Sequence, residues 1–111
     1  MIKSKSEMLV LTTEAVPSRE IVQALGLVRG STVRSKHVGS DIVASLRSIV
    51  GGEVREYAQL LAAAREQAID RMIDEAFMLG ADAVVAMRIQ TSTIQQGASE
   101  VLAYGTAVRL R

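Results

Sequence analysis

Apolar and polar residues alternate along the C-terminal part of the chain, and this period is typical of strands with one buried face. The alternation runs through residues 83–94 and again through residues 100–110, with the turn signal Gln95-Gln96-Gly97-Ala98 between them. Two alternating runs joined by a short turn that contains glycine predict an antiparallel hairpin. Unbroken alternation would place Val85 and Met87 on the same face of the first strand of this hairpin.

Two further apolar runs lie in the first third of the chain. Residues 8–12 form a short run that is typical of a strand. Residues 19–29 are apolar at most positions without strict alternation, which suits either a helix or a strand covered on both faces. Gly26 and Gly30 favour the strand, because glycine weakens a helix and often marks a bulge or a close approach in a sheet. Residues 32–35 are expected to continue this strand.

The central part of the chain has the period of amphipathic helices. Ser40 or Asp41 can cap a short helix formed by the apolar positions within residues 42–50. Gly51-Gly52 is expected to end that helix, because glycine adopts the left-handed C-cap conformation at low cost. A second, long helix is expected over residues 53–79.

These elements predict an α+β fold in the order β-β-α-α-β-β, with the long helix packed on one antiparallel sheet. Residues 8–111 are expected to form a single domain, since the chain has 111 residues and shows no repeat, linker or low-complexity tract. Residues 1–7 are polar and are expected to form a flexible N-terminus.

The long helix has two apolar faces. Successive residues lie about 100° apart, so one set falls within about 60° of Tyr57 and is expected to face the sheet: Tyr57, Leu61, Ala64, Ala68, Met72 and Leu79. A second set lies nearly opposite: Ala62, Ile69, Ile73 and Phe77. A two-layer domain covers only one face, so we interpret Ile69, Ile73 and Phe77 as a contact between subunits of a homo-oligomer. The alternatives are that these residues are exposed or that the short first helix covers them.

Composition supports an oligomer and argues against several other partners. Hydrophobic residues make up 49% of the chain and the mean hydropathy is +0.23, which favours additional burial between subunits. A net charge of +1 creates no field that would attract nucleic acid or an acidic membrane. The chain has no apolar run of about 18 residues, and residues 8–11 are too short for a signal-peptide core. We therefore expect a cytoplasmic protein without a membrane partner.

Missing residue types exclude many catalytic and metal sites. The chain has no cysteine, which rules out thiol catalysis and thiolate metal centres, and it has a single histidine. Two tyrosines, one phenylalanine and no tryptophan are too few for a platform that stacks nucleobases. The chain has no nucleophile elbow, phosphate-binding loop or dinucleotide fingerprint. The sequence favours a protein that is not an enzyme and has no predicted cofactor, while a small ligand or an ion stays open as a partner.

One group of acidic residues is a candidate metal site. Glu66, Asp70 and Asp74 follow one another at intervals of four residues and form a row along the long helix. Carboxylates are ligands for hard cations, so the row is a candidate site for a divalent ion. The alternative is a solvated helix face whose carboxylates pair with neighbouring basic residues.

Two further residues are candidates for a ligand contact. Glu75 lies near the centre of the sheet-facing stripe, where it is either an acid that contacts a ligand at a subunit interface or a partner of Arg71. His37 lies between the basic residues Arg34 and Lys36 on one side and Val38 on the other. It is either a turn residue at the surface or a metal ligand that ring symmetry brings together with its copies.

Several motifs together resemble one known family. They are Arg47-Ser48-Ile49-Val50-Gly51-Gly52, Tyr57, Ala64-Arg65-Glu66, Leu79-Gly80-Ala81-Asp82-Ala83-Val84-Val85, and the ending Tyr104-Gly105-Thr106-Ala107-Val108. At this spacing they resemble the YbjQ-like family of small bacterial and archaeal proteins, over nearly the whole chain from about residue 8. The resemblance implies an α+β subunit that assembles into a ring, a homopentamer. The family carries a heavy-metal-binding label, and its biochemical function is unassigned. Ala86 stands where relatives often have glycine.

Three functions follow from these observations. The first, which we predict, is a homo-oligomeric binding or scaffold protein. The second is a heavy-metal or divalent-cation binding protein that uses carboxylates or symmetry-related copies of His37. The third is an enzyme that uses Glu75 at a subunit interface.

Overall fold

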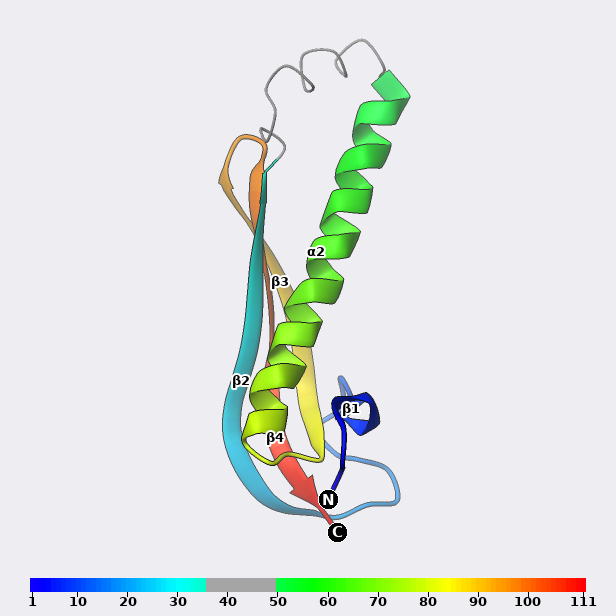
Figure 1. The fold of residues 1–111 in the computed structure, drawn as a ribbon, viewed down its shortest axis with the longest axis vertical. Coiled ribbons are helices and arrows are strands. Elements are labelled where there is room, and N and C mark those ends of the chain that lie inside the picture. Colours follow the sequence, from blue (N-terminus) through cyan, green and yellow to red (C-terminus); the bar gives the residue numbers. More distant parts are fainter. Residues whose placement is uncertain (36–49) are drawn as a thin grey trace.

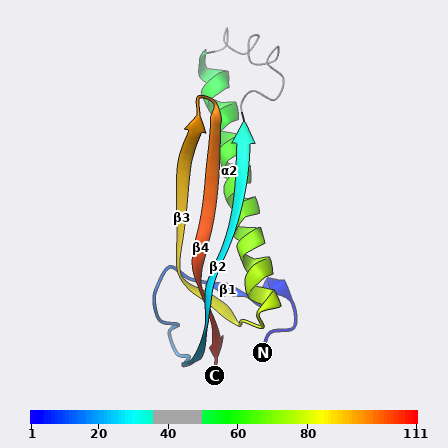
Figure 2. The ribbon, with the colours of Figure 1, turned by 90° about the vertical axis from the view of Figure 1, so that its left-hand side faces the viewer.

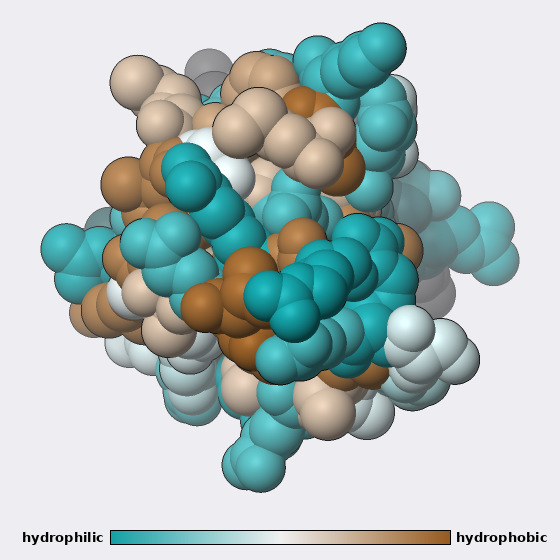
Figure 3. All heavy atoms as spheres, turned by 90° about the horizontal axis from the view of Figure 1, so that it is seen from below, coloured by the Kyte–Doolittle hydropathy of each residue, from teal (hydrophilic) through white to brown (hydrophobic). Residues whose placement is uncertain are grey.

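The polypeptide folds into two layers, a sheet and one long helix that covers one face of it (Figure 1). The computed structural model describes residues 1–35 and 50–111. Within them the elements are, in chain order, η1 (Lys5–Glu7), β1 (Leu9–Val10), β2 (Ile21–Ser35), α2 (Val50–Met78), β3 (Ala83–Gln95) and β4 (Ala98–Leu110). Both termini lie at one end of the molecule, where hydrophilic and hydrophobic side chains are interspersed (Figure 3). The α+β class expected from the sequence is confirmed.

The four strands form one mixed sheet in the order β1-β3-β4-β2. β4 pairs antiparallel with both β2 and β3, and the expected hairpin is present, with Gly97 at a φ of 79° in its turn. β1 runs parallel to β3, with residues 9–10 beside residues 83–84. The expectation of a wholly antiparallel sheet is wrong for β1, because alternation of side chains identifies a strand but not the direction of its partner.

The part of the chain that the structure describes contains one α-helix, and its elements follow the order β-β-α-β-β. The expectation that Gly51-Gly52 separates two helices is wrong, because both glycines lie in the first turns of α2. Glycine costs at most about 1 kcal/mol in a helix, so two glycines do not by themselves end one. The expected first helix, residues 42–50, lies outside the described residues except for Val50. No helix in the described ranges is long and apolar enough to cross a membrane.

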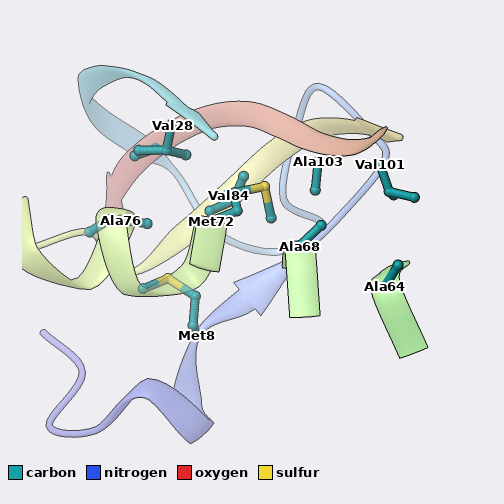
Figure 4. Packing of buried hydrophobic residues seen from close by; sticks show 11 residues of the cluster. Met8, Val28, Ala64, Ala68, Met72, Ala76, Val84, Val101 and Ala103 are labelled. Carbon is teal, nitrogen blue, oxygen red and sulfur yellow. The ribbon is translucent and has the colours of Figure 1, made fainter. Parts of the chain in front are cut away.

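The centre of α2 lies close to the sheet. Ala64, Ala68, Met72 and Ala76 are fully buried on the helix and face the strands (Figure 4). Gly30 of β2 lies opposite, and a Cβ atom at this position would overlap with Ala68 O and Met72 N. Small residues on both elements allow the two backbones to approach, so the sheet requires a residue without a side chain at position 30.

β3 contains a bulge at Ala86, whose φ of 52° lies in the left-handed region. Ala86 thus adopts a conformation that glycine reaches at lower cost than alanine. The bulge puts Val84 and Met87 against the core under α2, while Val85 joins a second cluster. The expectation that Val85 and Met87 share a face is wrong, because one extra residue reverses the faces of all later positions.

The opposite face of the sheet has a smaller core of its own. Side chains alternate along β4, so Ala107 packs under α2 and Val108 points to the other face. The second cluster consists of Val16, Ala83, Val85, Val108 and Leu110. Val16 comes from the connection between β1 and β2, so this connection covers the sheet only near the end that carries the termini.

Replacing Gly30 with alanine should destabilise the protein. The added methyl group would overlap with the backbone of α2 and would lie 2.7 Å from Arg71 Cβ, so the helix must move away from the sheet. Overpacking of this kind costs about 1–3 kcal/mol. Urea denaturation followed by circular dichroism measures the change, with Ser31→Ala as an exposed control on the same strand that should stay within about 0.5 kcal/mol of the natural sequence. Equal stability of Gly30→Ala and Ser31→Ala would show that the helix is not constrained there.

Candidate functional site

The acidic row proposed as a cation site lies on the solvent side of α2. Glu66, Asp70 and Asp74 are all exposed. Lys5 Nζ donates a hydrogen bond to Asp74 Oδ1 at 2.7 Å, and this hydrogen bond and the charge of Asp74 raise the pKa of the Lys5 ammonium. Across the described ranges, no three His, Cys, Asp or Glu side chains converge in a way that could hold a metal ion. His37 lies outside those ranges, so a site built from its symmetry-related copies stays a prediction.

Glu75 does not face the sheet, and this expectation is wrong. Its side chain is exposed, while the adjacent Ala76 is fully buried. The buried face rotates along a helix of 29 residues that crosses a twisted sheet, so a fixed angle of 100° per residue misplaces positions far from its starting point. Arg71, the expected partner, donates from Nη1 to Ser31 O of β2 at 2.6 Å. Glu75 is therefore a solvent-facing acid in the subunit.

The second apolar stripe of α2 is partly covered within the subunit. Ile69, Ile73 and Phe77 are half-buried and pack against the main core cluster. Met8 belongs to the same cluster and lies on the side of α2 away from Val28, so residues before β2 supply part of the cover (Figure 4). The remaining exposed area of this stripe is available to another chain, and its assignment as a subunit contact stays a prediction.

Asp82 is a buried carboxylate that the sequence did not single out. Only 5% of the residue is exposed, and its Oδ2 accepts a hydrogen bond from Leu110 N at 2.8 Å while Oδ1 accepts one from Ile2 N at 3.2 Å. The hydrogen bond from Leu110 is the main reason that the pKa of Asp82 lies below its usual value, and burial acts in the opposite direction. The carboxylate ties together the turn after α2 and both ends of the chain. Its position in an apolar run, Ala81 to Val85, was the available signal.

A polar cluster lies between α2 and the strands toward the start of the helix. Arg34 Nη2 donates to Gln67 Oε1 at 2.7 Å, and the hydroxyls of Tyr57 and Ser99 share a hydrogen bond of 2.8 Å. Arg34 Nε is buried and has no hydrogen-bond partner among the residues that the structure describes. The Arg34–Gln67 and Tyr57–Ser99 hydrogen bonds each join the helix to a strand. Their role is structural, because they fix the position of α2 on the sheet.

An open depression of about 530 Å³ lies where the chain after β1 crosses the bulge of β3. Thr12, Met87, Arg88 and Ile89 line it. Arg88 Nη1 donates to Thr12 O at 3.0 Å and to Met87 O at 2.8 Å, so the guanidinium holds the crossing segment in place. The lining residues offer one cation and one hydroxyl but no paired nucleophile and base, so the depression has no arrangement suited to catalysis.

Comparison with known proteins defines the family. The family model YbjQ_1, described as "Putative heavy-metal-binding", matches residues 8–111. The chain therefore belongs to this family, as the sequence resemblance predicted. A UPF0145 protein of Archaeoglobus fulgidus is 58% identical over 107 residues, which cover 96% of this chain and 99% of the relative. A UPF0145 protein of Thermus thermophilus, TTHA1944, is 57% identical over 94% of this chain and 91% of its own length.

A solved structure supports the fold. The crystal structure of a protein of unknown function from Pediococcus pentosaceus, assigned to the DUF74 family, superposes with a TM-score of 0.59 at 17% sequence identity. The superposition covers 94% of this chain and 98% of the other. At this identity the similarity establishes the two-layer fold and says nothing about the ligands or the assembly of this chain.

Asp82 should make the stability of the protein depend on pH. Its pKa is lowered in the folded state, so the carboxylate stabilises the fold above the ordinary aspartate value of 3.8 and loses this effect as the pH falls through the folded pKa. Asp82→Asn should lower the free energy of unfolding by about 1–3 kcal/mol at pH 7 and make it less sensitive to acid. Urea denaturation at pH 7, 5 and 3.5 measures both effects. Glu66→Gln, an exposed control, should reproduce the natural pH profile; an unchanged profile in Asp82→Asn would contradict this role.

Proposed function

We propose that this chain is the subunit of a cytoplasmic homo-oligomer, a homopentameric ring, that acts as a binding or scaffold protein and not as an enzyme. The shape of the subunit carries this proposal. Its extents are 55 × 23 × 22 Å and its radius of gyration is 17.4 Å, whereas a compact domain of this length has about 13 Å. So elongated a chain leaves a large surface for its mass, and assembly is the simplest way to bury it. The ring of five rests on the family resemblance.

Large apolar side chains on the surface support assembly. Leu27 is 61% exposed and Val33 is 58% exposed on β2, and Ile94 is 57% exposed near the hairpin turn. All three lie on strands of the sheet, and burial against another chain would remove their apolar area from water. Ile69 and Ile73 add a half-buried apolar strip on the helix side. The subunit thus offers apolar surface on both of its layers.

Binding of a heavy metal or divalent cation is the second candidate function. The description of the family and the exposed row Glu66, Asp70 and Asp74 favour it. The row comes from one helix, whereas a hard-cation site needs ligands that converge from several directions. A ring would bring several copies of the chain together, so this function also depends on assembly.

Charge placed in the second stripe of α2 should dissociate the oligomer. Ile73→Asp and Phe77→Asp each put an unpaired carboxylate into a contact that assembly is expected to desolvate, which is strongly unfavourable. Light scattering measures the molar mass, and circular dichroism reports whether the subunit is still folded. Met78→Asp is the matched control, because Met78 is on the same helix and 87% exposed. A folded Ile73→Asp or Phe77→Asp protein of unchanged mass would contradict the role of this stripe.

Native mass spectrometry of protein purified without chelator or affinity metal should show an oligomer of five subunits without a stoichiometric metal. A defined additional mass that EDTA removes, and that the triple variant Glu66→Gln, Asp70→Asn, Asp74→Asn fails to retain, would establish the cation-binding function instead. A monomer at micromolar concentration would contradict the proposed assembly.

A further inference from the structure

The sheet has two open edges that face in opposite directions. β2 is the last strand of the order β1-β3-β4-β2, so within the described residues no strand pairs with its outer edge. β3 is covered by β1 and the residues after it only as far as Met87, whose N donates to Leu11 O at 3.0 Å. From Arg88 to Gln95 its outer edge has no partner strand among the described elements. Open edges of this length are templates for pairing with another chain.

The helix is displaced toward one of these edges. α2 packs chiefly against β2, less against β4, and hardly touches β3 (Figure 2). It overhangs β2 far enough for Arg71 to bond the outward carbonyl of Ser31. On the same face, the far half of β3 is uncovered, and Ile89, Thr91 and Thr93 are exposed there. The helix therefore extends beyond the β2 edge of the sheet, while the far half of β3 at the other edge has no helix over it.

The two edges match in direction and level. β2 and β3 are both antiparallel to β4, so they run parallel to each other. Glu100 of β4 lies between Val33 on one side and Ser92 on the other, which places these two residues at the same level and on the same face. If a neighbouring copy lies beside this one with no shift along the strand direction, its β3 from Arg88 onward lies next to the stretch of β2 at the same level, around Val33.

Backbone groups are in the correct phase for this pairing. The carbonyl of Ser31 points outward to Arg71, so by alternation Arg29 and Val33 also point their backbone groups outward. The N–H of Met87 points outward to Leu11, and alternation places those of Ile89, Thr91 and Thr93 outward as well. In a parallel pair, a residue whose N–H and C=O point toward the partner strand lies opposite a residue whose N–H and C=O point away from it. The first residue then bonds to the two residues that flank the second in the partner strand. Val33 opposite Ser92 meets this requirement.

We propose that subunits join by parallel pairing of β2 of one copy with residues 88–95 of β3 of the next, which continues the sheet from subunit to subunit. Val33 then lies beside Ser92 of the partner subunit, and Ile89 of the partner subunit lies under the overhanging α2. Arg71 releases the Ser31 carbonyl to the incoming strand. A head-to-tail contact of this kind closes into a ring when the rotation between copies permits it. The inference rests on the proposed oligomer and names its contact.

Cysteine cross-linking tests the register. The chain has no cysteine, so two introduced thiols have no native competitor. Within one chain, positions 33 and 92 are separated by β4, about 10 Å apart, which is too far for a disulfide, whereas paired strands bring them to about 5 Å. Oxidised Val33→Cys, Ser92→Cys protein should lose most of its monomer band on a non-reducing gel and form a ladder of covalent multimers. Each single variant should stay monomeric on the gel.

Two controls separate the outcomes. Val33→Cys with Thr91→Cys places the thiols on opposite faces, and equal cross-linking of this pair would overturn the proposed register. Cross-linking of Val33→Cys alone would show that two β2 strands meet instead. An oligomeric native mass without a ladder in the Val33→Cys, Ser92→Cys protein would overturn the edge contact and leave the proposed function standing. A monomeric native mass would overturn both.

A proline variant tests the same contact without cross-linking. Because the N–H of Thr91 points outward, Thr91→Pro removes no hydrogen bond to β4 and is tolerated on an open edge. It should cause a loss of the oligomer by light scattering while the circular dichroism spectrum is retained. Thr91→Val, which keeps the N–H, should assemble normally. A folded Thr91→Pro protein of unchanged mass would contradict pairing at this edge.

Discussion

The close contact between α2 and β2 is the constraint on which the remaining structure depends. The helix backbone approaches the strand at Gly30 because alanines occupy the helix side of the contact. Each alanine buries little apolar area, so the stability of this layer comes from backbone proximity and from the length of the contact more than from large side chains. Met72 is the largest fully buried side chain among the described residues, which shows how thin this core is.

A thin core explains why the subunit is long and narrow. α2 packs chiefly against β2, and hydrogen bonds from Arg34 to Gln67 and from Arg71 to the Ser31 carbonyl hold this alignment. With the helix held over β2, it cannot also cover β3. The uncovered strand is thus a direct result of the small residues that draw the helix to one side. Surface available for assembly follows from the same packing that stabilises the subunit.

Most of the secondary structure was predictable from side-chain period, and the errors have physical causes. The hairpin was predictable because strict alternation on both sides of Gly97 is typical of paired strands joined by a tight turn. The parallel direction of β1 was not, because that direction is decided by where residues 11–20 cross the sheet. The bulge at Ala86 reverses the faces of β3, and neither residue type nor spacing indicates a left-handed alanine. Gly51-Gly52 has the composition of a helix end, where glycine is common, but glycine is also tolerated inside a helix at a modest cost, and both residues are helical here.

The candidate site was less predictable than the fold. The spacing from Glu66 to Asp74 places this row on one helix face, and the structure keeps it on one exposed face. Glu75 was misplaced because helix rotation accumulates over several turns. Asp82 was overlooked because a buried carboxylate in a turn depends on the main-chain N–H groups of Ile2 and Leu110, residues 80 and 28 positions away. The apolar run around Asp82 indicates that it is buried, but its long-range main-chain partners leave no local pattern in a sequence.

The position of β4 in the sheet has a consequence for synthesis of the protein. β4 lies between β3 and β2, yet it is the last described element to leave the ribosome. Until it emerges, β2 has no strand beside it, and α2 has only an incomplete sheet to pack on. The nascent chain must therefore keep these earlier strands from other chains until β4 has been made. Such a topology ties the formation of the core to the synthesis of β4, because a chain without this strand lacks the centre of its sheet.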